Sequence, residues 1–434
     1  MARCPAVNLL RFGTRSGFLR PLHAAAGGRS AEPRAGFKPD RVAVVTKTTR
    51  YEFEQQRYRY AGLSEEDLKQ LLAMKGSSYS GLLQRHNIHT SNVEHVVQSL
   101  QSAGVEVRVV RRGEYDEEVV RWADAIVSAG GDGTMLLVAS KVLNKDKPVV
   151  GVNTDPDRSE GHLCLPVRYT HAFPEALERL CRGEFRWLWR QRLRLHLEGT
   201  GINPSPVDLH EQQLSLEQHN RAHRISTVDR QQRAGALHPA YSKPSLLPVR
   251  SLNEIFIGES LSSRYRPGPT RPDPPAGRMA SYYEISVDGG PWEKQKSSGL
   301  SVCTGTGSKA WSYNINKLAG QSVEEVLRIG ASRARVELPL SREFLERVTD
   351  DYNASLVFAP DEPRLFYSVR EPISNRVFSS SRQRGFATKV CVRSRCWDAC
   401  MVVDGGTSFE FNDGAIATVT VSEEDRLRTV LLDQ

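Results

Sequence analysis

The sequence predicts an α/β domain with a mostly parallel, Rossmann-like sheet, followed by a mainly antiparallel β domain. Three observations predict it. Short β-branched runs alternate with amphipathic helical patterns over residues 37–184, strand-like segments separated by turn residues fill 185–434, and a glycine-rich turn at 130–133 joins a buried strand directly to a helix. Strands that alternate with helices usually form parallel sheets with helices on both faces.

The first domain is expected to contain four buried strands. They are short runs rich in Val, Ile and Ala, at residues 41–47, 105–110, 124–129 and 147–153. The segments between them have apolar side chains at helical spacing, and Ser64 is a candidate N-cap for one helix. Helices are therefore expected over 63–76, 91–104 and 115–123.

The second domain is expected to be built from antiparallel strands. Alternating or continuous apolar runs, separated by turn residues, lie at 185–199, 248–259, 280–295, 299–304 and 389–406. Residues 201–248 are polar and 264–279 are rich in proline, so both segments are expected to be mobile insertions. The last residues are expected to return to the first domain.

The charge and composition exclude several classes of protein. The chain has a net charge of +8, but residues 1–36 hold six arginines and one acid, so that the other residues carry only +3 and nucleic acid is not expected as a partner. An Arg-rich, acid-poor leader is typical of a mitochondrial transit peptide and predicts the matrix, although a disordered tail without an address is the alternative. No apolar run approaches the length of a membrane helix. The spacing of Cys391, Cys396 and Cys400 is not that of a zinc site.

A Gly-Gly-Asp-Gly-Thr turn at residues 130–134 links the third predicted strand to a helix. Glycines let backbone N–H groups approach an anion closely, and a helix N-terminus favours negative charge. A carboxylate at Asp132 would repel phosphate unless it faced a hydroxyl that loses its proton while attacking phosphorus. Alternatively, Asp132 forms an Asx turn or caps the helix. The turn alone leaves both roles open.

A second motif lies in the β domain, at residues 297–314 (SSGLSVCTGTGSKAWSYN). Residues 305–310 fit the dinucleotide pattern G-x-G-x-x-A, but no βαβ unit surrounds them, so they predict a Rossmann site only weakly. Hydroxyl and small side chains beside Trp311 would suit a flat, polar ligand such as adenosine. The alternative is a glycine-rich β-turn next to a tryptophan of the core.

A third feature is the polar pair Asn253-Glu254 inside an apolar strand. Burying such a pair without partners costs several kcal/mol, roughly 2–7 for each amide-like group. The pair therefore either contacts a ligand or satisfies neighbouring backbone groups. The Walker A pattern and the serine-hydrolase pattern G-x-S-x-G are both missing from the sequence.

Together, these three motifs resemble those of the NAD kinase family. In that family a GGDG-T turn is followed by an Asn-Glu pair and then by a DG…T-P-T-G-S-T-A-Y segment, and the same order occurs here at 130–134, 253–254 and 299–311. The segments GVNTDP (151–156) and VVDGG (402–406) are also similar to family segments. The resemblance extends from about residue 40 to the C-terminus, and with the leader it is greatest to mitochondrial members from animals.

The resemblance implies an active site in the cleft between the two domains. It implies ATP-dependent phosphorylation of NAD at the 2′-hydroxyl of the adenosine ribose, with Asp132 as general base and ATP carrying Mg²⁺. Gly130, Gly131, Gly133 and Thr134 would form the phosphate-facing loop. The residues implied to hold NAD are Asn253, Glu254, Thr304, Thr306, Gly307, Ser308, Ala310 and Trp311. No metal site made of protein side chains is expected, and a homodimer is expected because the family is commonly oligomeric.

Four positions depart from the family pattern. Ser298 replaces an aspartate, Gly305 a proline, Lys309 a threonine and Trp311 a tyrosine. Glycine at 305 should make the turn more flexible. Lys309 adds a cation that either contacts a phosphate or extends into solvent.

Two other functions remain open from the sequence. Diacylglycerol and sphingosine kinases also carry a GGDG turn between two such domains, but the Asn-Glu pair and the 299–311 segment argue against a lipid kinase. A non-catalytic sensor of NAD or NADP on a kinase fold is the other alternative, and the substitutions at 305 and 309 keep it open.

Overall fold

The computed structural model describes residues 36–57, 60, 62–200, 202–214, 242–259, 280–375, 377–378 and 382–433. They belong to one unit, residues 36–434. The leader predicted at 1–36 lies outside the described residues apart from its last residue. So do the proline-rich segment 264–279 and most of the predicted insertion at 201–248.

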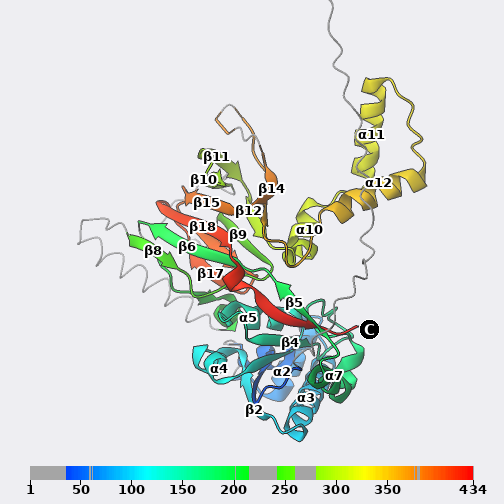
Figure 1. The fold of residues 1–434 in the computed structure, drawn as a ribbon, viewed down its shortest axis with the longest axis vertical. Helices are drawn as coiled ribbons and strands as arrows, with labels where there is room; N and C mark the ends of the chain where they lie inside the picture. Colours follow the sequence, from blue (N-terminus) through cyan, green and yellow to red (C-terminus); the bar gives the residue numbers. More distant parts are fainter. Residues whose placement is uncertain are drawn as a thin grey trace, which may run out of the picture. The chain divides into compact units, whose positions relative to one another are not determined.

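The first sheet has six strands in the order β2-β1-β3-β4-β19-β5. The first four are parallel, as the alternating sequence pattern predicts. The last strand of the chain, β19, runs parallel to β4 and antiparallel to β5, and Figure 1 shows red β19 beside green β5. The bounds are β1 Arg41–Thr46, β2 Glu106–Arg111, β3 Ala125–Ala129, β4 Pro148–Val152, β5 Arg186–Arg190 and β19 Leu427–Leu431.

Helices cover both faces of this sheet. On one face, Val42, Val44 and Val127 pack against α3 (Tyr79–Ser102) and α7 (Phe173–Arg182). On the other face, alternate residues of the same strands pack against α4 (Glu117–Trp122) and α5 (Asp132–Lys141). Burial of both faces explains why these strands consist of continuous apolar runs. The other helices of this part are α1 Arg50–Gln56, α2 Glu65–Met74 and α6 Arg168–His171.

The rest of the chain forms two antiparallel sheets that share one hydrophobic core, so the predicted fold class is confirmed. One sheet has the order β11-β10-β15-β18-β6-β8 and the other β14-β13-β12-β9-β16-β17-β7. The strands of the first are β6 Leu193–Gly199, β8 Ser242–Leu246, β10 Ser281–Val287, β11 Glu293–Ser297, β15 Lys389–Ser394 and β18 Ala415–Val421. Those of the second are β7 Val207–Asp208, β9 Glu254–Glu259, β12 Gly299–Cys303, β13 Leu365–Arg370, β14 Arg384–Ala387, β16 Ala399–Val403 and β17 Thr407–Glu410.

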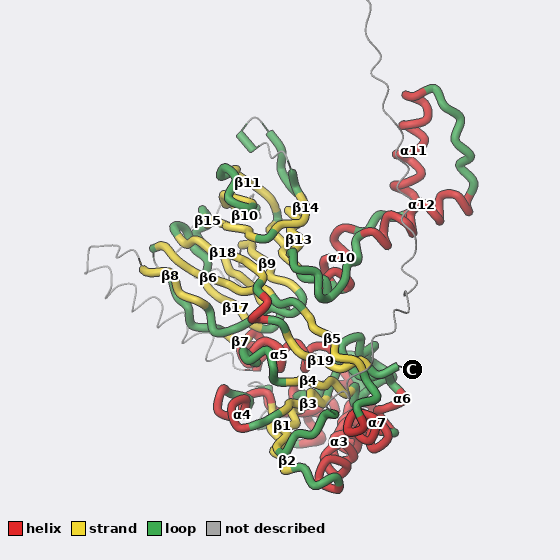
Figure 2. Tube along the Cα trace, viewed as in Figure 1, coloured by secondary structure: helices red, strands yellow, loops and turns green. Residues whose placement is uncertain are grey.

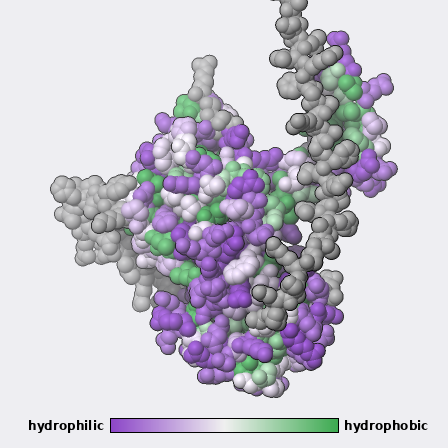
Figure 3. Space-filling model, viewed as in Figure 1, coloured by the Kyte–Doolittle hydropathy of each residue, from purple (hydrophilic) through white to green (hydrophobic). Residues whose placement is uncertain are grey.

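Three helices within this β-rich part were not expected from the sequence: α10 (Trp311–Asn316), α11 (Gly320–Ala334) and α12 (Arg342–Ser355). Figure 2 shows α11 and α12 extending away from the strands as a hairpin. Val323 is the one buried residue of α11, and α12 has none. Val326 and Ile329 are instead exposed, and Figure 3 shows hydrophobic surface on this hairpin.

Two other segments differ from the expected domain division. The run at 185–199 forms two strands in different sheets, because β5 completes the parallel sheet and β6 starts the antiparallel one. Both ends of the predicted 201–248 insertion contain regular structure, namely β7 with α8 (Leu209–Leu214) and β8. Pairing of β8 with β6 and of β7 with β17 supplies the hydrogen bonds that these polar segments need.

Candidate active site

The GGDGT turn lies at the carboxyl end of β3 and leads directly into α5. A Cβ atom on Gly130 would lie 2.2 Å from Oγ1 of Thr134, and one on Gly131 would lie 2.5 Å from Oγ of Ser159. A side chain at 130 would therefore displace the buried Thr134, and one at 131 would require Ser159 to rotate away. A Cβ on Gly133 would meet no atom within 4 Å, so this glycine faces open space. The glycines keep the turn compact and leave its outer side open.

Asp132 is the first residue of α5, and Gly131 occupies the N-cap position without a side-chain hydrogen bond. The role of N-cap considered for Asp132 is therefore not found. Its carboxylate instead accepts hydrogen bonds from the backbone N–H groups of His162 (3.2 Å) and Leu163 (2.8 Å). These two bonds fix the orientation of the carboxylate, which remains half-buried and lines a cavity.

That cavity has a volume of about 540 Å³ and is lined on one side by residues 131–134. Three cationic side chains, Lys47, Arg112 and Arg158, lie around it, and residues 404–406 of the VVDGG segment line it as well. Lys47 forms an ion pair of 3.4 Å with Asp155, a second carboxylate of the cavity wall. Glycine backbone, hydroxyls and cations around one cavity form an environment that suits a polyphosphate.

The Asn-Glu pair is held by Asp404, which follows β16 next to the start of β9. Its carboxylate accepts hydrogen bonds from Oγ of Ser251 and from the backbone N–H groups of residues 252, 253 and 254, at 2.7–3.0 Å. Asn253 Oδ1 and Glu254 Oε2 are buried and have no hydrogen-bond partner within the described part of the chain. Burial, and to a lesser degree the charge of Asp404, raises the pKa of Glu254 to about 8.

The glycine-rich turn at 304–310 packs directly against Asn253. The backbone N–H of Thr304 donates to the Asn253 carbonyl at 3.0 Å, and a Cβ on Gly307 would lie 2.1 Å from that oxygen. The structure therefore brings together the two motifs that predict NAD binding. Thr304, Thr306, Gly307 and Ser308 are buried here, whereas Ala310 is half-buried.

The structure explains why position 305 is a glycine, which the sequence alone did not indicate. A Cβ atom there would lie 1.8 Å from the carbonyl oxygen of Ala359. Oγ of Ser308 donates to the Gly305 carbonyl and accepts from the backbone N–H of Phe358. The segment that follows α12 thus occupies the space that a proline ring would need.

Lys309 and Trp311 lie at the exposed side of the turn. Lys309 is exposed, and 38% of the Trp311 side chain is accessible to solvent. The ring of Trp311 contacts that of Phe256 edge-on, and the Arg370 guanidinium lies 5.7 Å from its centre. Trp311 is therefore not a core tryptophan, which was the alternative considered for it.

Sequence reasoning missed Arg190, which contacts the glycine-rich turn and lies near enough to Asp132 for the two charges to interact. Its Nη1 donates to Thr306 Oγ1 and its Nε to Thr429 Oγ1, both at 3.3 Å. Burial lowers the pKa of Arg190 to about 10, although the charges of Asp132 and Cys164 act in the opposite direction. Arg190 belongs to a strand that contains two tryptophans and is far from the motifs in sequence. Nothing in its local sequence predicts that it contributes to the site.

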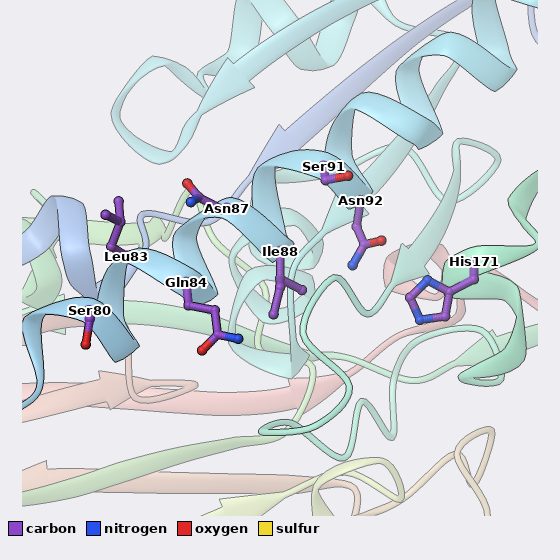
Figure 4. A pocket seen from close by; sticks show the side chains of 8 residues that line it. All are labelled: Ser80, Leu83, Gln84, Asn87, Ile88, Ser91, Asn92 and His171. Atoms are coloured by element: carbon purple, nitrogen blue, oxygen red, sulfur yellow. The ribbon is translucent and has the colours of Figure 1, made fainter.

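A second cavity, of about 640 Å³, is lined by α3 and His171 (Figure 4). None of the residues predicted to bind NAD or ATP lines it. In the described ranges, no group of three or more His, Cys, Asp and Glu side chains is arranged to hold a metal ion. The helices described include none that is long and apolar enough to cross a membrane.

Comparisons with known proteins agree with these motifs. A model of the ATP-NAD kinase N-terminal domain matches residues 42–185. The protein called NAD kinase 2, mitochondrial, is 69% identical over 415 residues in Rattus norvegicus, with 96% of this chain and 92% of the relative covered. In Homo sapiens the identity is 68%, with 96% and 89% covered.

The chain belongs to the NAD kinase family.

The predictions of family and enzyme class are thereby confirmed, and a lipid kinase or a non-catalytic sensor has no support. The names of these relatives support a mitochondrial location.

Among solved structures, yeast NADH kinase complexed with NADH aligns with a TM-score of 0.47 and 12% identity, covering 91% of this chain and 84% of that one. An NAD kinase from Archaeoglobus fulgidus in complex with ATP aligns with a TM-score of 0.44 and 17% identity, covering 91% and 93%.

Proposed function

We propose that this NAD kinase transfers the γ-phosphoryl group of ATP to the 2′-hydroxyl of the adenosine ribose of NAD, with Asp132 as general base. One observation carries the assignment of the site. Asp132 lines a cavity whose wall also contains the open glycine backbone at 133 and the cations Lys47, Arg112 and Arg158. A carboxylate beside a polyphosphate-binding surface is the arrangement that phosphoryl transfer to a hydroxyl requires.

The triphosphate of ATP would occupy this cavity. Lys47 and Arg158 approach the GGDGT turn from loops that follow β1 and β4, so their charges would act on the phosphates from two sides. Mg²⁺ carried by the nucleotide would neutralise the phosphate charge that develops during transfer. Mg²⁺ prefers oxygen ligands, and the carboxylate of Asp155 in the cavity wall is a ligand of that kind.

The adenosine half of NAD would lie against Asn253, Glu254 and the turn that contains Thr306. The partnerless oxygen atoms of Asn253 and Glu254 support this placement, because a ligand that donates hydrogen bonds would remove their desolvation cost. A pKa of about 8 keeps Glu254 largely protonated at neutral pH, so its carboxyl group could donate as well as accept. Lys309, which is exposed, would reach a phosphate of NAD from the rim.

The proposal is tested by supplying the chain without its leader with ATP, Mg²⁺ and NAD, and by offering diacylglycerol and sphingosine in parallel. The expected product is NADP, with the phosphate on the 2′-oxygen as located by phosphorus NMR. Phosphate transferred to lipid but not to NAD would overturn the proposal. Omitting Mg²⁺ should abolish turnover, since the phosphates would then lack their counter-ion.

We further propose a homodimer in the mitochondrial matrix. The exposed apolar side chains of α11, including Val326 and Ile329, provide a surface that a second copy could bury. Light scattering should give twice the mass of the chain without its leader, and Val326→Glu with Ile329→Glu should give the single mass. A single mass for the unmodified chain would contradict the dimer. Residues 1–36 fused to a reporter should deliver it to the matrix and not to the intermembrane space.

A further inference from the structure

Arg190 lies where two parts of the proposed site meet. It is the last residue of β5, and its side chain extends to Thr429 in the neighbouring strand and to Thr306 in the glycine-rich turn. Asp132, the proposed base, lies close enough for its charge to act on the guanidinium. The guanidinium therefore contacts the turn that would hold the adenosine and lies near the carboxylate that would take the hydroxyl proton.

The hydrogen-bonding capacity of Arg190 is not used up by its neighbours. A guanidinium has five N–H donors, and the contacts of Arg190 within the described residues are one hydrogen bond to each of two threonine hydroxyls. Within the same residues it forms no ion pair, whereas Arg250, which is buried, is paired with Asp425 at 2.6 Å. A half-buried cation with unused donors provides a site for an anion.

The buried Arg192, two residues later, shows what a purely structural arginine looks like in this fold. Its guanidinium donates to the carbonyl oxygens of Ala139 and Val142 at the end of α5, and to that of Asp425. Those acceptors are backbone groups in the protein interior, and no substrate can replace them. Arg190 has two side-chain hydroxyls instead, and one of them, on Thr306, belongs to the proposed NAD site.

We propose that Arg190 binds the phosphoryl group as it arrives on the 2′-oxygen of NAD, and so recognises the 2′-phosphate of NADP. This inference rests on the proposed function. In the reaction the 2′-oxygen forms a bond to the γ-phosphorus, the bond from that phosphorus to the bridging oxygen breaks with its electron pair leaving on ADP, and the hydroxyl proton passes to Asp132. The new phosphate dianion then lies beside the proposed base, and a fixed cation at this position offsets the increase in negative charge.

A guanidinium is well suited to this task. It stays charged even with a pKa of about 10, and its planar fork donates two parallel hydrogen bonds to phosphate oxygens. NAD has only a hydroxyl at the same place, so the contact would be made mainly after the phosphate has arrived. Arg190 would therefore stabilise the transition state and the product more than the bound substrate.

The test compares Arg190→Gln and Arg190→Lys with Arg186→Gln, a control on the same strand whose exposed side chain pairs with Asp433. Calorimetry without ATP gives the dissociation constants for NAD and for NADP. Their ratio would not change in the variants if Arg190 had only a structural role. For Arg190→Gln we expect NADP binding to weaken about ten- to hundredfold, as for a lost charged hydrogen bond, and NAD binding to change less than about threefold. Arg190→Lys should fall between, because it keeps the charge and loses the fork.

Each outcome of this test decides one question. If NAD and NADP binding weaken equally, so that the ratio of their dissociation constants is unchanged, the proposed role of Arg190 is overturned. A residue that only stabilises the strand would affect both ligands alike. A fall in kcat at unchanged KM for NAD in Arg190→Gln would support it further. If the unmodified chain makes no NADP, the proposed function itself fails. If it makes NADP while the ratio stays constant in the variants, only the inference about Arg190 fails.

Discussion

The carboxylate of Asp404 accepts a hydrogen bond of 2.9 Å from the backbone N–H of Asn253, which links a turn of the phosphate cavity to the proposed NAD site. Asp404 also has a positive φ of 48°, a conformation that Asn and Asp tolerate better than most residues. Both properties make the side chain at 404 a structural support for the site.

Asp404→Asn should therefore keep the backbone conformation and weaken the support. An amide has one acceptor oxygen and would turn its NH2 group toward one of the four donors, so we expect the free energy of unfolding to fall by about 1.5–3 kcal/mol. NAD affinity should fall with it. Asp413→Asn, at an exposed aspartate, is the control, and chemical denaturation with NAD titration gives both quantities. Unchanged NAD binding would show that the four hydrogen bonds do not position Asn253 and Glu254.

Asp132→Asn should separate binding from chemistry. The amide oxygen can still accept from Leu163, but the residue can no longer take a proton, so kcat should drop by about 10²–10⁴ while the Kd for NAD changes a few-fold. Asp146→Asn, at an exposed aspartate, should leave both unchanged. If turnover survives in Asp132→Asn, Asp132 serves only to hold the 161–165 loop in place through its hydrogen bonds. If NAD binding is lost as well, this structural role is the main one.

Glu254 should make stability depend on pH. Its pKa is 4.5 in an unfolded chain and about 8 in the fold, so between these values folding takes up a proton and the contribution of this group to stability falls as pH rises. In Glu254→Gln the side chain does not titrate, so this pH-dependent loss of stability does not occur. The free energy of unfolding of Glu254→Gln relative to the unmodified chain should rise by about 2–4 kcal/mol from pH 4.5 to 8 and then level off. A difference that stays flat in denaturation curves across this range would refute the raised pKa.

Asp208 should control the affinity for ATP. It receives two hydrogen bonds from Arg112, at 3.0 and 3.1 Å, and directly precedes α8, whose His210 lines the phosphate cavity. Asp208→Asn keeps the backbone contact to His210 and loses the ion pair, so KM for ATP should rise about three- to tenfold while KM for NAD changes less than twofold. Glu117→Gln, which removes an exposed pair with Arg121, is the control. Equal rises in both KM values would argue that the effect is on stability and not on the cavity.

Gly305 and Gly330 should respond in opposite directions to alanine. A Cβ at 305 would collide with the Ala359 carbonyl, so Gly305→Ala should lower the free energy of unfolding by about 1–3 kcal/mol and weaken NAD binding. Gly330 lies in the exposed α11 with no atom within 4 Å of a Cβ, and Gly330→Ala should add up to about 1 kcal/mol through helix propensity. Thermal unfolding of the two variants tests both signs. A neutral Gly305→Ala would mean that the segment after α12 moves aside easily.

The parallel sheet could be predicted because β1, β3 and β4 are buried on both faces and consist mostly of Val, Ile and Ala. The first half of α3 could not, because its residues include His89, which is buried and hydrogen-bonded to Thr154 far away in the sequence. The helices α11 and α12 bury almost nothing, so their apolar spacing is too weak to predict them.

The candidate site was predictable where it is continuous in sequence and not where it is assembled from separate loops. Each of the three motifs can be recognised locally. The GGDGT turn and the glycine-rich turn indicate a tight backbone, and the Asn-Glu pair is a polar group in an apolar strand. Lys47, Arg112 and Arg158 come from three different loops, and nothing in their local sequence distinguishes them from other surface cations. Arg190 needed the structure for the same reason.

The place of β19 between β4 and β5 has a consequence for biosynthesis. A ribosome delivers β1 to β5 long before it reaches residues 427–431, so the edge of β4 that β19 covers stays open until those residues have been synthesised. During that interval, an unpaired, apolar parallel strand is available to other chains. A chain that stops before residue 427 would leave the edge of β4 permanently uncovered and prone to aggregation.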